Sequence, residues 1–371
     1  MSVKEPPFTI GIEEEYLLVD KDTRELASDP PASMLEDCES RCAGQVSPEF
    51  MRSQIEIGTK VCANIREARE DLARLRRIIV DVADKHGLAP IAASTHPLAH
   101  WLEQKHTPKE RYNALATEMQ GAARRLLICG MHVHVGIEDD TLRIDLMNQF
   151  SYFLPHLLAL STSSPFWHGR ETGLKSYRTI ILGNLPRAGI PPSFGSWAEY
   201  KSFIDTLVET ECIDEPTKIW WDIRPNPNYP TLEYRFPDIC TRVDEVVCVA
   251  ALLLGVTAKL IKLRQRNIQW REYRRNLLAE NKWRAVRYGT EGKLIDFGKR
   301  TEVPLRVLVH EILEEIDDVV DELEIRKEVE YVHKILEQGT SADRQLAVYH
   351  KSRDLRAVVD HVIAETKTGI D

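Results

Sequence analysis

The sequence predicts an α+β fold rather than a regular alternation of strands and helices. Short segments with period-two alternation are separated by long segments with helical periodicity, so the strands must pair across helical insertions. The chain has 371 residues, of which 43% are apolar, and this is enough to bury a sizeable core. We expect a single domain over residues 1–371, of which about 300–371 forms a helical C-terminal region.

The predicted strands are short, and each alternates apolar and polar residues. The segment "TIGIEEEYLLV" lies in the first strand, at about 8–19, and "QIEIGT" and "CGMHVHVGI" alternate in the same way. Further along, "IWWDIRP" (219–225) and "TLEYRF" (231–236) are joined by the turn-like "NPNYP". The last two segments are therefore expected to form adjacent strands.

The predicted helices show apolar residues three and four positions apart. Gly87 follows residues 65–86 as an end signal, and within them this spacing relates Ile65, Ala68, Leu72, Leu75, Ile79 and Val82. The other predicted helices cover about 107–128, 142–163, 197–209, 243–280, 304–337 and 342–366. A polar, glycine-marked segment at 287–300 separates the last two from the rest.

Composition narrows the function classes. The chain carries 49 basic and 58 acidic residues, a net charge of −9, which argues against nucleic acid or an anionic membrane as partner. No uninterrupted apolar run of membrane-spanning length and no secretory signal are visible. The seven cysteines form no CxxC pair, which is typical of reduced thiols. We therefore expect a cytoplasmic protein that acts on small molecules.

The three adjacent glutamates of the first strand do not face the same way. Successive side chains of a strand point to opposite faces, so Glu13 and Glu15 share one face. Glu14 shares the other face with apolar neighbours such as Ile12 and Tyr16. We therefore expect Glu14 to lie on the core side, apart from the other two carboxylates.

The same split gives three further strands a polar face. These faces carry Glu56 with Gln54, His132 with His134, and Glu233 with Arg235. An antiparallel sheet with one face in water would also alternate, but such a face usually includes lysine, and these faces carry none. Carboxylates that crowd together need a cation or must bind protons, and oxygen ligands suit Mg²⁺ or Mn²⁺. A metal-bearing sheet face is the favoured interpretation.

Other motifs leave alternatives open. The pair in "HVH" also occurs in zinc hydrolases, so a metal-dependent hydrolase remains a second hypothesis. The segment "SSPFWHGRETGLKSYR" (163–178) is rich in residues that bind phosphate or carboxylate, and "ENKWRAVRYG" (280–289) is basic and amphipathic. The first segment is a substrate or phosphate loop or an ordinary solvated loop, and the second is a ligand-binding segment or the end of a basic amphipathic helix. The motifs GxxxxGK[ST], GxGxxG and GxSxG are absent.

Nine segments in order resemble one known family. Besides those quoted above they include "STHP", "PRAGIPP" and "TLEYRFPD", and they run from about residue 8 to 289. The chain resembles the glutamate–cysteine ligase type 2 family, and within it the YbdK-like carboxylate–amine ligase subgroup. The resemblance implies a fold like the glutamine synthetase catalytic domain, with a curved antiparallel sheet and helices on its outer face. It also implies a single ligase catalytic domain that binds ATP with Mg²⁺ or Mn²⁺.

The resemblance further implies roles for individual residues. The metal ligands would be Glu13, Glu15, Glu49, Glu56, His132 and Glu233. Arg235, Arg178 and Arg170 would act on the transferred phosphate or a substrate carboxylate, and Asn281, Trp283 and Arg284 would lie near the nucleotide. ATP would phosphorylate the γ-carboxylate of glutamate, and an amine such as cysteine would attack the acyl phosphate to form an amide.

Some points remain open at the level of sequence. Ile181 stands where the family is expected to have an aromatic residue, and no motif identifies the amine. A catalytically idle relative that binds nucleotide is a third hypothesis. The helix-rich second half of the chain, together with the resemblance, predicts a homodimer.

Overall fold

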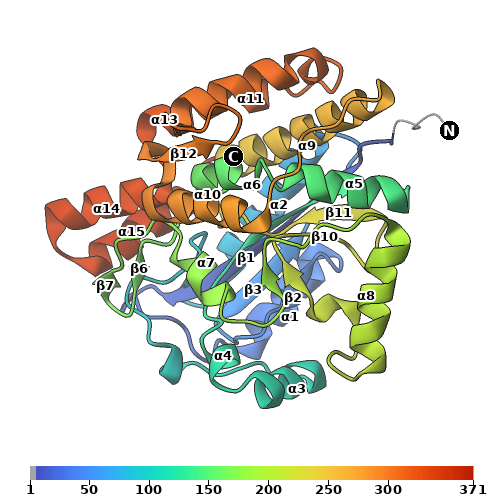
Figure 1. Cartoon of the computed structure of the whole chain (residues 1–371). Coiled ribbons are helices and arrows are strands. Elements are labelled where there is room, and N and C mark those ends of the chain that lie inside the picture. Colours follow the sequence, from blue (N-terminus) through green and yellow to red (C-terminus); the bar gives the residue numbers. More distant parts are fainter. Residues whose placement is uncertain (1–5, 371) are drawn as a thin grey trace.

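The computed structural model describes residues 6–370 and centres on one antiparallel sheet (Figure 1). Its seven strands follow the order β10-β11-β5-β1-β3-β2, and β4 pairs with the end of β1. The strands are β1 (Ile10–Asp20), β2 (Val46–Pro48), β3 (Gln54–Gly58), β4 (Leu88–Ile91), β5 (Met131–Gly136), β10 (Ile223–Pro225) and β11 (Thr231–Tyr234). The four predicted polar faces thus belong to adjacent strands of one sheet.

The strand register brings the ionisable side chains together. Glu13 lies opposite His132 on β5 and Glu15 lies opposite Glu56 on β3. Glu233 on β11 lies opposite His134 of β5. Because directly opposed residues in an antiparallel pair have neighbouring side chains, the polar faces form one continuous surface. A shift of one residue in any strand would turn its ionisable side chains into the core.

Helices cover the other face of the sheet. The helices α2 (Ile65–Lys85), α5 (Asp140–Phe150) and α9 (Val243–Gln265) pack there, and α2 also contacts α9. The most apolar window of α9 is long enough to cross a membrane, but 83% of it is buried within the protein, as in a core helix. The predicted α+β fold, with an antiparallel sheet and helices on one face, is confirmed.

Glu14 lies in this helix-covered core, as the strand alternation predicts. Its carboxylate forms an ion pair with Arg76 of α2, and both side chains are fully buried. The Arg76 guanidinium also donates to the hydroxyl of Tyr16 and to the backbone carbonyls of Thr241 (2.6 Å) and Thr366 (3.4 Å). A buried arginine is tolerated because its donors are satisfied in this way.

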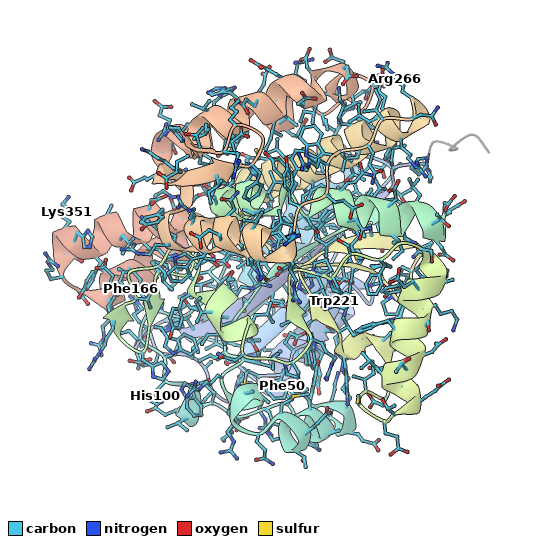
Figure 2. All side chains as sticks on the ribbon, in the orientation of Figure 1. Phe50, His100, Phe166, Trp221, Arg266 and Lys351 are labelled. Carbon is cyan, nitrogen blue, oxygen red and sulfur yellow. The ribbon has the colours of Figure 1, made fainter. Side chains whose placement is uncertain are left out.

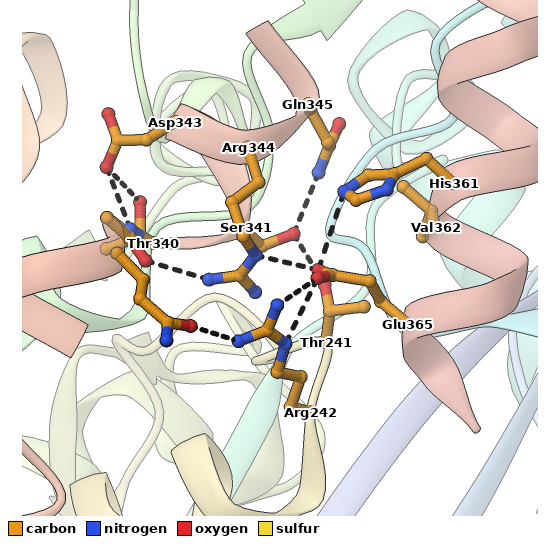
Figure 3. Close-up of polar contacts among 12 residues, drawn as sticks. Thr241, Arg242, Thr340, Ser341, Asp343, Arg344, Gln345, His361, Val362 and Glu365 are labelled. Atoms are coloured by element: carbon orange, nitrogen blue, oxygen red, sulfur yellow. Dashed lines mark hydrogen bonds and ion pairs between the residues drawn. The ribbon is translucent and has the colours of Figure 1, made fainter. Parts of the chain in front are cut away.

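The C-terminal region is helical, as predicted, and is tied to the rest of the chain by ion pairs (Figure 3). It comprises α11 (Leu305–Val320), α12 (Arg326–Glu330), α13 (Val332–Gln338), α14 (Ser341–Ser352) and α15 (Leu355–Thr366). Glu365 of α15 accepts hydrogen bonds from Arg344 of α14 (2.7 Å) and from Arg242, which precedes α9. Arg344 also pairs with Glu245 of α9 at 2.8 Å. The last two helices are thereby fixed against the core helix.

Several predicted helices are interrupted in the structure. The segment 107–128 is divided into α3 (Glu110–Met119) and α4 (Gly121–Arg124) at Gln120, whose φ is 47°. Residues 142–163 give α5 and α6 (Leu154–Ser161), with Pro155 in the first turn of α6, and 243–280 gives α9 and α10 (Arg275–Tyr288). Proline is favoured at a helix start and disrupts a helix interior, which explains the second break.

The remaining elements are small. Helix α8 (Trp197–Glu209) has the predicted bounds, whereas α1 (Ala32–Cys42) and the short α7 (Tyr177–Leu182) were not predicted. A hairpin of β12 (Lys293–Asp296) and β13 (Thr301–Pro304) begins in the polar, glycine-marked segment 287–300 and ends just after it. The other pairs are β6 (Phe166–Trp167) with β7 (Arg170–Glu171) and β8 (Ala188–Gly189) with β9 (Trp220–Trp221). The segment 219–225, predicted as one strand, is divided into β9 and β10, and β6, β7 and β8 carry too few residues for a period-two signal.

Candidate functional site

A cavity of about 310 Å³ opens on the polar face of the sheet. All six predicted metal ligands line it, and so do Arg178 and Arg235. Phe50, labelled in Figure 2, is another lining residue and lies toward α3. The cavity therefore collects acidic groups from β1, the end of β2, β3 and β11, and basic groups from outside β1.

Glu13 is held between two histidines. Its Oε2 lies 3.0 Å from Nδ1 of His132, and its Oε1 lies 3.3 Å from Nε2 of His134. Burial alone would raise the pKa of Glu13, but the hydrogen bonds from both rings outweigh it and the pKa falls well below its usual value. Burial and the nearby Arg235 lower the pKa of His132 to about 4. Glu13 is therefore charged and His132 is neutral at pH 7, the forms in which both bind metals.

Three other carboxylates crowd together beside Glu13. Burial, followed by the negative charge of Glu49, raises the pKa of Glu15 to about 7. Burial and the charges of the neighbouring glutamates raise the pKa of Glu56 well above its usual value, and burial also raises that of Glu49. Like charges at this distance oppose one another's ionisation. A bound cation would relieve this repulsion.

The donor atoms are close enough to hold cations. Oxygen and nitrogen atoms lie within 4.8 Å of one another in three sets, namely Glu13–Glu56–His132, Glu15–Glu49–Glu56 and Glu13–His134–Glu233. The sets are dominated by carboxylate oxygens and contain no cysteine. Such donors suit a hard divalent cation such as Mg²⁺ or Mn²⁺ better than a zinc ion bound by thiolates. The residues present therefore fit the predicted metal.

Glu233 differs from the other predicted ligands, because arginines already surround it. Arg224 donates to it through Nε (2.8 Å) and Nη2 (3.3 Å), Asn226 donates through Nδ2 (2.9 Å), and Arg235 forms an ion pair with it. Burial would raise the pKa of Glu233, but Arg235 and Arg224 reverse the effect and lower it well below its usual value. Most of its lone pairs are engaged, so it orients the two arginines whether or not it also contacts a metal.

Arg178 is positioned by the serine-rich segment that precedes it. Asp238 accepts hydrogen bonds from Ser164 Oγ (2.7 Å), Ser176 Oγ (2.8 Å) and the backbone N–H of Ser163 (2.9 Å). Ser164 Oγ in turn accepts from the backbone N–H of Arg178 at 3.1 Å. The hydroxyls of "SSPFWHGRETGLKSYR" thus fix the backbone from which Arg178 extends into the cavity.

The absence of a side chain at Gly130 leaves room for the Arg178 guanidinium. A substitution at Gly130 therefore tests whether the position of Arg178 matters for activity. A Cβ at Gly130 would lie within 3.0 Å of three guanidinium atoms, so Gly130→Ala must displace them. We expect kcat/KM to fall about 100-fold, the cost of displacing a positioned group by roughly 1 Å. Steady-state kinetics would check this. The matched control is Gly121→Ala in α4, where a Cβ meets no atom within 4 Å and activity should stay at the wild-type level.

Four residues predicted for the site lie outside this cavity. Arg170 is exposed on β7. The side-chain amide of Asn281 exchanges two hydrogen bonds with the backbone of Ile295 on β12 (2.9 and 2.7 Å). Trp283 is 47% exposed, and Arg284 pairs with Glu280 and Glu302. These three residues of α10 hold the β12–β13 hairpin or face solvent, and none lines a cavity described here.

Several lining residues were not predicted. Arg224 and Asn226 bind Glu233, and Arg111 and Tyr112 of α3 lie near Glu49. Arg224 could have been found from the alternation of "IWWDIRP", because it lies four positions after Trp220 and therefore on the same strand face. Trp220 also lines the cavity. Arg111 has no such signal, because it lies on a helix and the alternation of the strands does not report which helix borders the cavity.

A second cavity of about 710 Å³ adjoins the first and shares Glu13, Glu56 and Tyr229 with it. Its floor contains Gly11, Gly58 and Gly136 from three neighbouring strands. Glycines in strands allow another group to approach the backbone closely. The polar face of the sheet therefore offers two connected chambers with the carboxylates between them.

Comparison with known proteins places the chain in a family. The family model described as glutamate–cysteine ligase family 2 matches residues 9–361. A protein of Rhodospirillum rubrum, provisionally named glutamate–cysteine ligase 2, is 53% identical over 376 residues, covering 98% of this chain and 97% of its own length. A protein of Solibacter usitatus with the same provisional name is 48% identical and covers 100% of this chain and 96% of its own.

Solved structures share the fold at low sequence identity. A bifunctional glutathione synthetase from Pasteurella multocida superposes with a TM-score of 0.73 at 13% identity, covering 97% of this chain and 52% of that protein. A glutamate–cysteine ligase from Francisella tularensis, solved in complex with AMP, gives 0.71 at 13% identity and covers 99% of this chain and 90% of its own. The chain therefore belongs to glutamate–cysteine ligase family 2 and is a ligase of the class that forms carbon–nitrogen bonds.

Proposed function

We propose that this chain is an ATP-dependent carboxylate–amine ligase that activates the γ-carboxylate of glutamate and condenses it with an amine. One observation carries the proposal, namely that five carboxylates and His132 converge with four arginines in one cavity. Phosphoryl transfer depends on positioning and on neutralising the charge of the phosphate oxygens, which such a set can do. A simple hydrolase would not require Arg178, Arg224 and Arg235 together.

The proposed reaction consists of two successive displacement steps. A carboxylate oxygen of the substrate attacks the terminal phosphorus of ATP, and ADP leaves, giving an acyl phosphate. The amine nitrogen then attacks the acyl carbon, phosphate leaves, and the amine loses a proton. The products are an amide, ADP and phosphate.

Different residues would bind the metal, the phosphoryl group and the substrate carboxylate. Glu13, Glu15, Glu49, Glu56 and His132 would hold Mg²⁺ or Mn²⁺, which would neutralise phosphate oxygens when bound. Arg235, oriented by Glu233, would bind the phosphoryl group being transferred. Arg178 would bind a carboxylate of a substrate. The nucleoside of ATP would occupy the larger cavity.

ADP release tests the proposal. The enzyme with ATP, Mg²⁺ and glutamate should release ADP when an amine is added, and hydroxylamine, a small and unselective nucleophile, should give a hydroxamate. Gly58→Val, which projects into the larger cavity, should raise the KM for ATP more than the KM for glutamate. No ADP release with any carboxylate and amine, and unchanged activity in Glu13→Ala, would contradict the proposal.

A further inference from the structure

The smaller cavity has an apolar wall that the proposed reaction leaves without a role. The wall is formed by Leu115 of α3, Leu126 and Ile128 before β5, and Leu182 and Leu185 at the end of α7. Ile128 and Leu185 are buried, and the other three are half-buried at the cavity surface. Metal binding and phosphoryl transfer require charged or polar groups, so five aliphatic side chains here need another explanation.

Two cations line the same cavity as this wall. Arg178 is only 4% exposed and donates to the carbonyls of Phe236 (3.1 Å) and Arg235 (3.0 Å), yet its Nε has no hydrogen-bond partner. Within residues 6–370 it forms no ion pair with a carboxylate. Arg111 is exposed, lies over the ring of Tyr112 at 5.2 Å, and likewise has no ion pair in the described chain. The charges of Glu15 and Asp238 act on Arg178, and that of Glu49 acts on Arg111, but no carboxylate of the described residues contacts either guanidinium directly. A buried guanidinium with an unused N–H donor favours direct binding of an anion.

The wall is larger than the carboxylate substrate needs. The side chain of glutamate offers two methylene groups, which can cover only a small part of five aliphatic residues. A short polar or thiol side chain on the amine would leave the rest of the wall in water. Apolar contact contributes in proportion to the area removed from water, so a large apolar group fits this surface best.

We propose that the amine substrate is an α-amino acid with a large aliphatic or aromatic side chain. The side chain would contact the wall, and the α-carboxylate would bind Arg178 and Arg111. The α-amino group would then attack the acyl phosphate. This inference rests on the proposed ligase function and specifies the substrate class of the same site.

An amine panel tests the inference on the full-length enzyme with ATP, Mg²⁺ and glutamate. Leucine and phenylalanine should show kcat/KM values at least about tenfold above those of serine and aspartate, the size of discrimination that an apolar pocket gives. Leucinamide, which lacks the carboxylate, should be a poorer substrate than leucine. Product formation is followed by ADP release and by mass spectrometry of the amide.

Two variants test the apolar wall and the carboxylate-binding arginines separately. Leu182→Ser should reduce the ratio of leucine to serine specificity about tenfold. Arg111→Ala should raise the KM for leucine and leave the KM for leucinamide unchanged. Leu277→Ser on α10, at a residue that is 44% exposed and lies outside both cavities, is the control and should leave every ratio at the wild-type value.

The outcomes distinguish this inference from the proposed function. If glutamate and hydroxylamine give a hydroxamate but leucine reacts no better than serine, the inference is wrong and the ligase function stands. If aliphatic carboxylic acids replace glutamate as the activated substrate, the wall belongs to the carboxylate partner and the inference is again wrong. If no hydroxamate forms with any carboxylate, both are overturned.

Discussion

Glu14→Gln is expected to lower the free energy of unfolding by about 3–5 kcal/mol, the usual cost of breaking a buried ion pair by removing one charge. Glu14 and Arg76 are both fully buried, so the guanidinium would keep its charge in the core without a carboxylate. Urea unfolding followed by circular dichroism measures the change. At temperatures where the variant stays folded, kcat should remain near the wild-type value, because Glu14 lies on the opposite face from the cavity.

The control for this prediction lies on the same helix. Arg66 of α2 pairs with Glu324 at 3.6 Å, but their side chains are 71% and 78% exposed. Arg66→Met should change the free energy of unfolding by at most about 1 kcal/mol, as for other exposed ion pairs. The double variant Glu14→Met/Arg76→Met should lose less stability than the two single variants together, because neither charge is then left alone. If the loss of stability in the double variant equals the sum of the two single losses, Glu14 and Arg76 do not stabilise each other.

Glu15→Gln is expected to reduce kcat by on the order of 10²–10³-fold while the fold stays intact, and Glu13→Gln should do the same. Glutamine keeps the size of the side chain and can still accept the hydrogen bond from the backbone N–H of Gly130, which is 2.6 Å long in the wild type. What it loses is the negative charge needed to hold a cation. Rates measured over a Mg²⁺ titration should show a raised metal requirement.

The three adjacent glutamates thus form an internally controlled series. Replacement of Glu13 or Glu15 by glutamine should reduce turnover, whereas replacement of Glu14 should reduce the free energy of unfolding. Circular dichroism and urea unfolding of all three variants, beside ADP release, would check both properties at once. A large loss of turnover at all three positions with unchanged stability would show that the strand does not separate them.

The period-two alternation indicates which ionisable side chains form the floor of the smaller cavity. It separated Glu14 from its neighbours and placed Glu56, His132 and Glu233 on one surface, because in a sheet the direction of a side chain follows from its position alone. The alternation does not report which helix closes the cavity. Arg111 reaches it from α3 through a long-range arrangement that no local pattern records.

The α10 prediction shows why residue type alone was a weaker guide. Asn281 and Arg284 belong to residue classes that bind phosphates, but the structure uses them on the hairpin that follows. Polar side chains near a helix end serve neighbouring backbone groups as readily as ligands. Without a strand register to fix their direction, the sequence could not separate the two uses.

The carbonyls that satisfy Arg76 tie β1 to parts of the chain that are distant in sequence. Its acceptors at Thr241 and Thr366 lie 165 and 290 residues further along the chain. Until α15 packs against the core, the guanidinium beneath β1 lacks its acceptor at Thr366. Contacts of such separation close late. The strand that carries Glu13 and Glu15 is therefore expected to gain its full backing late in folding, when these distant segments have docked against Arg76.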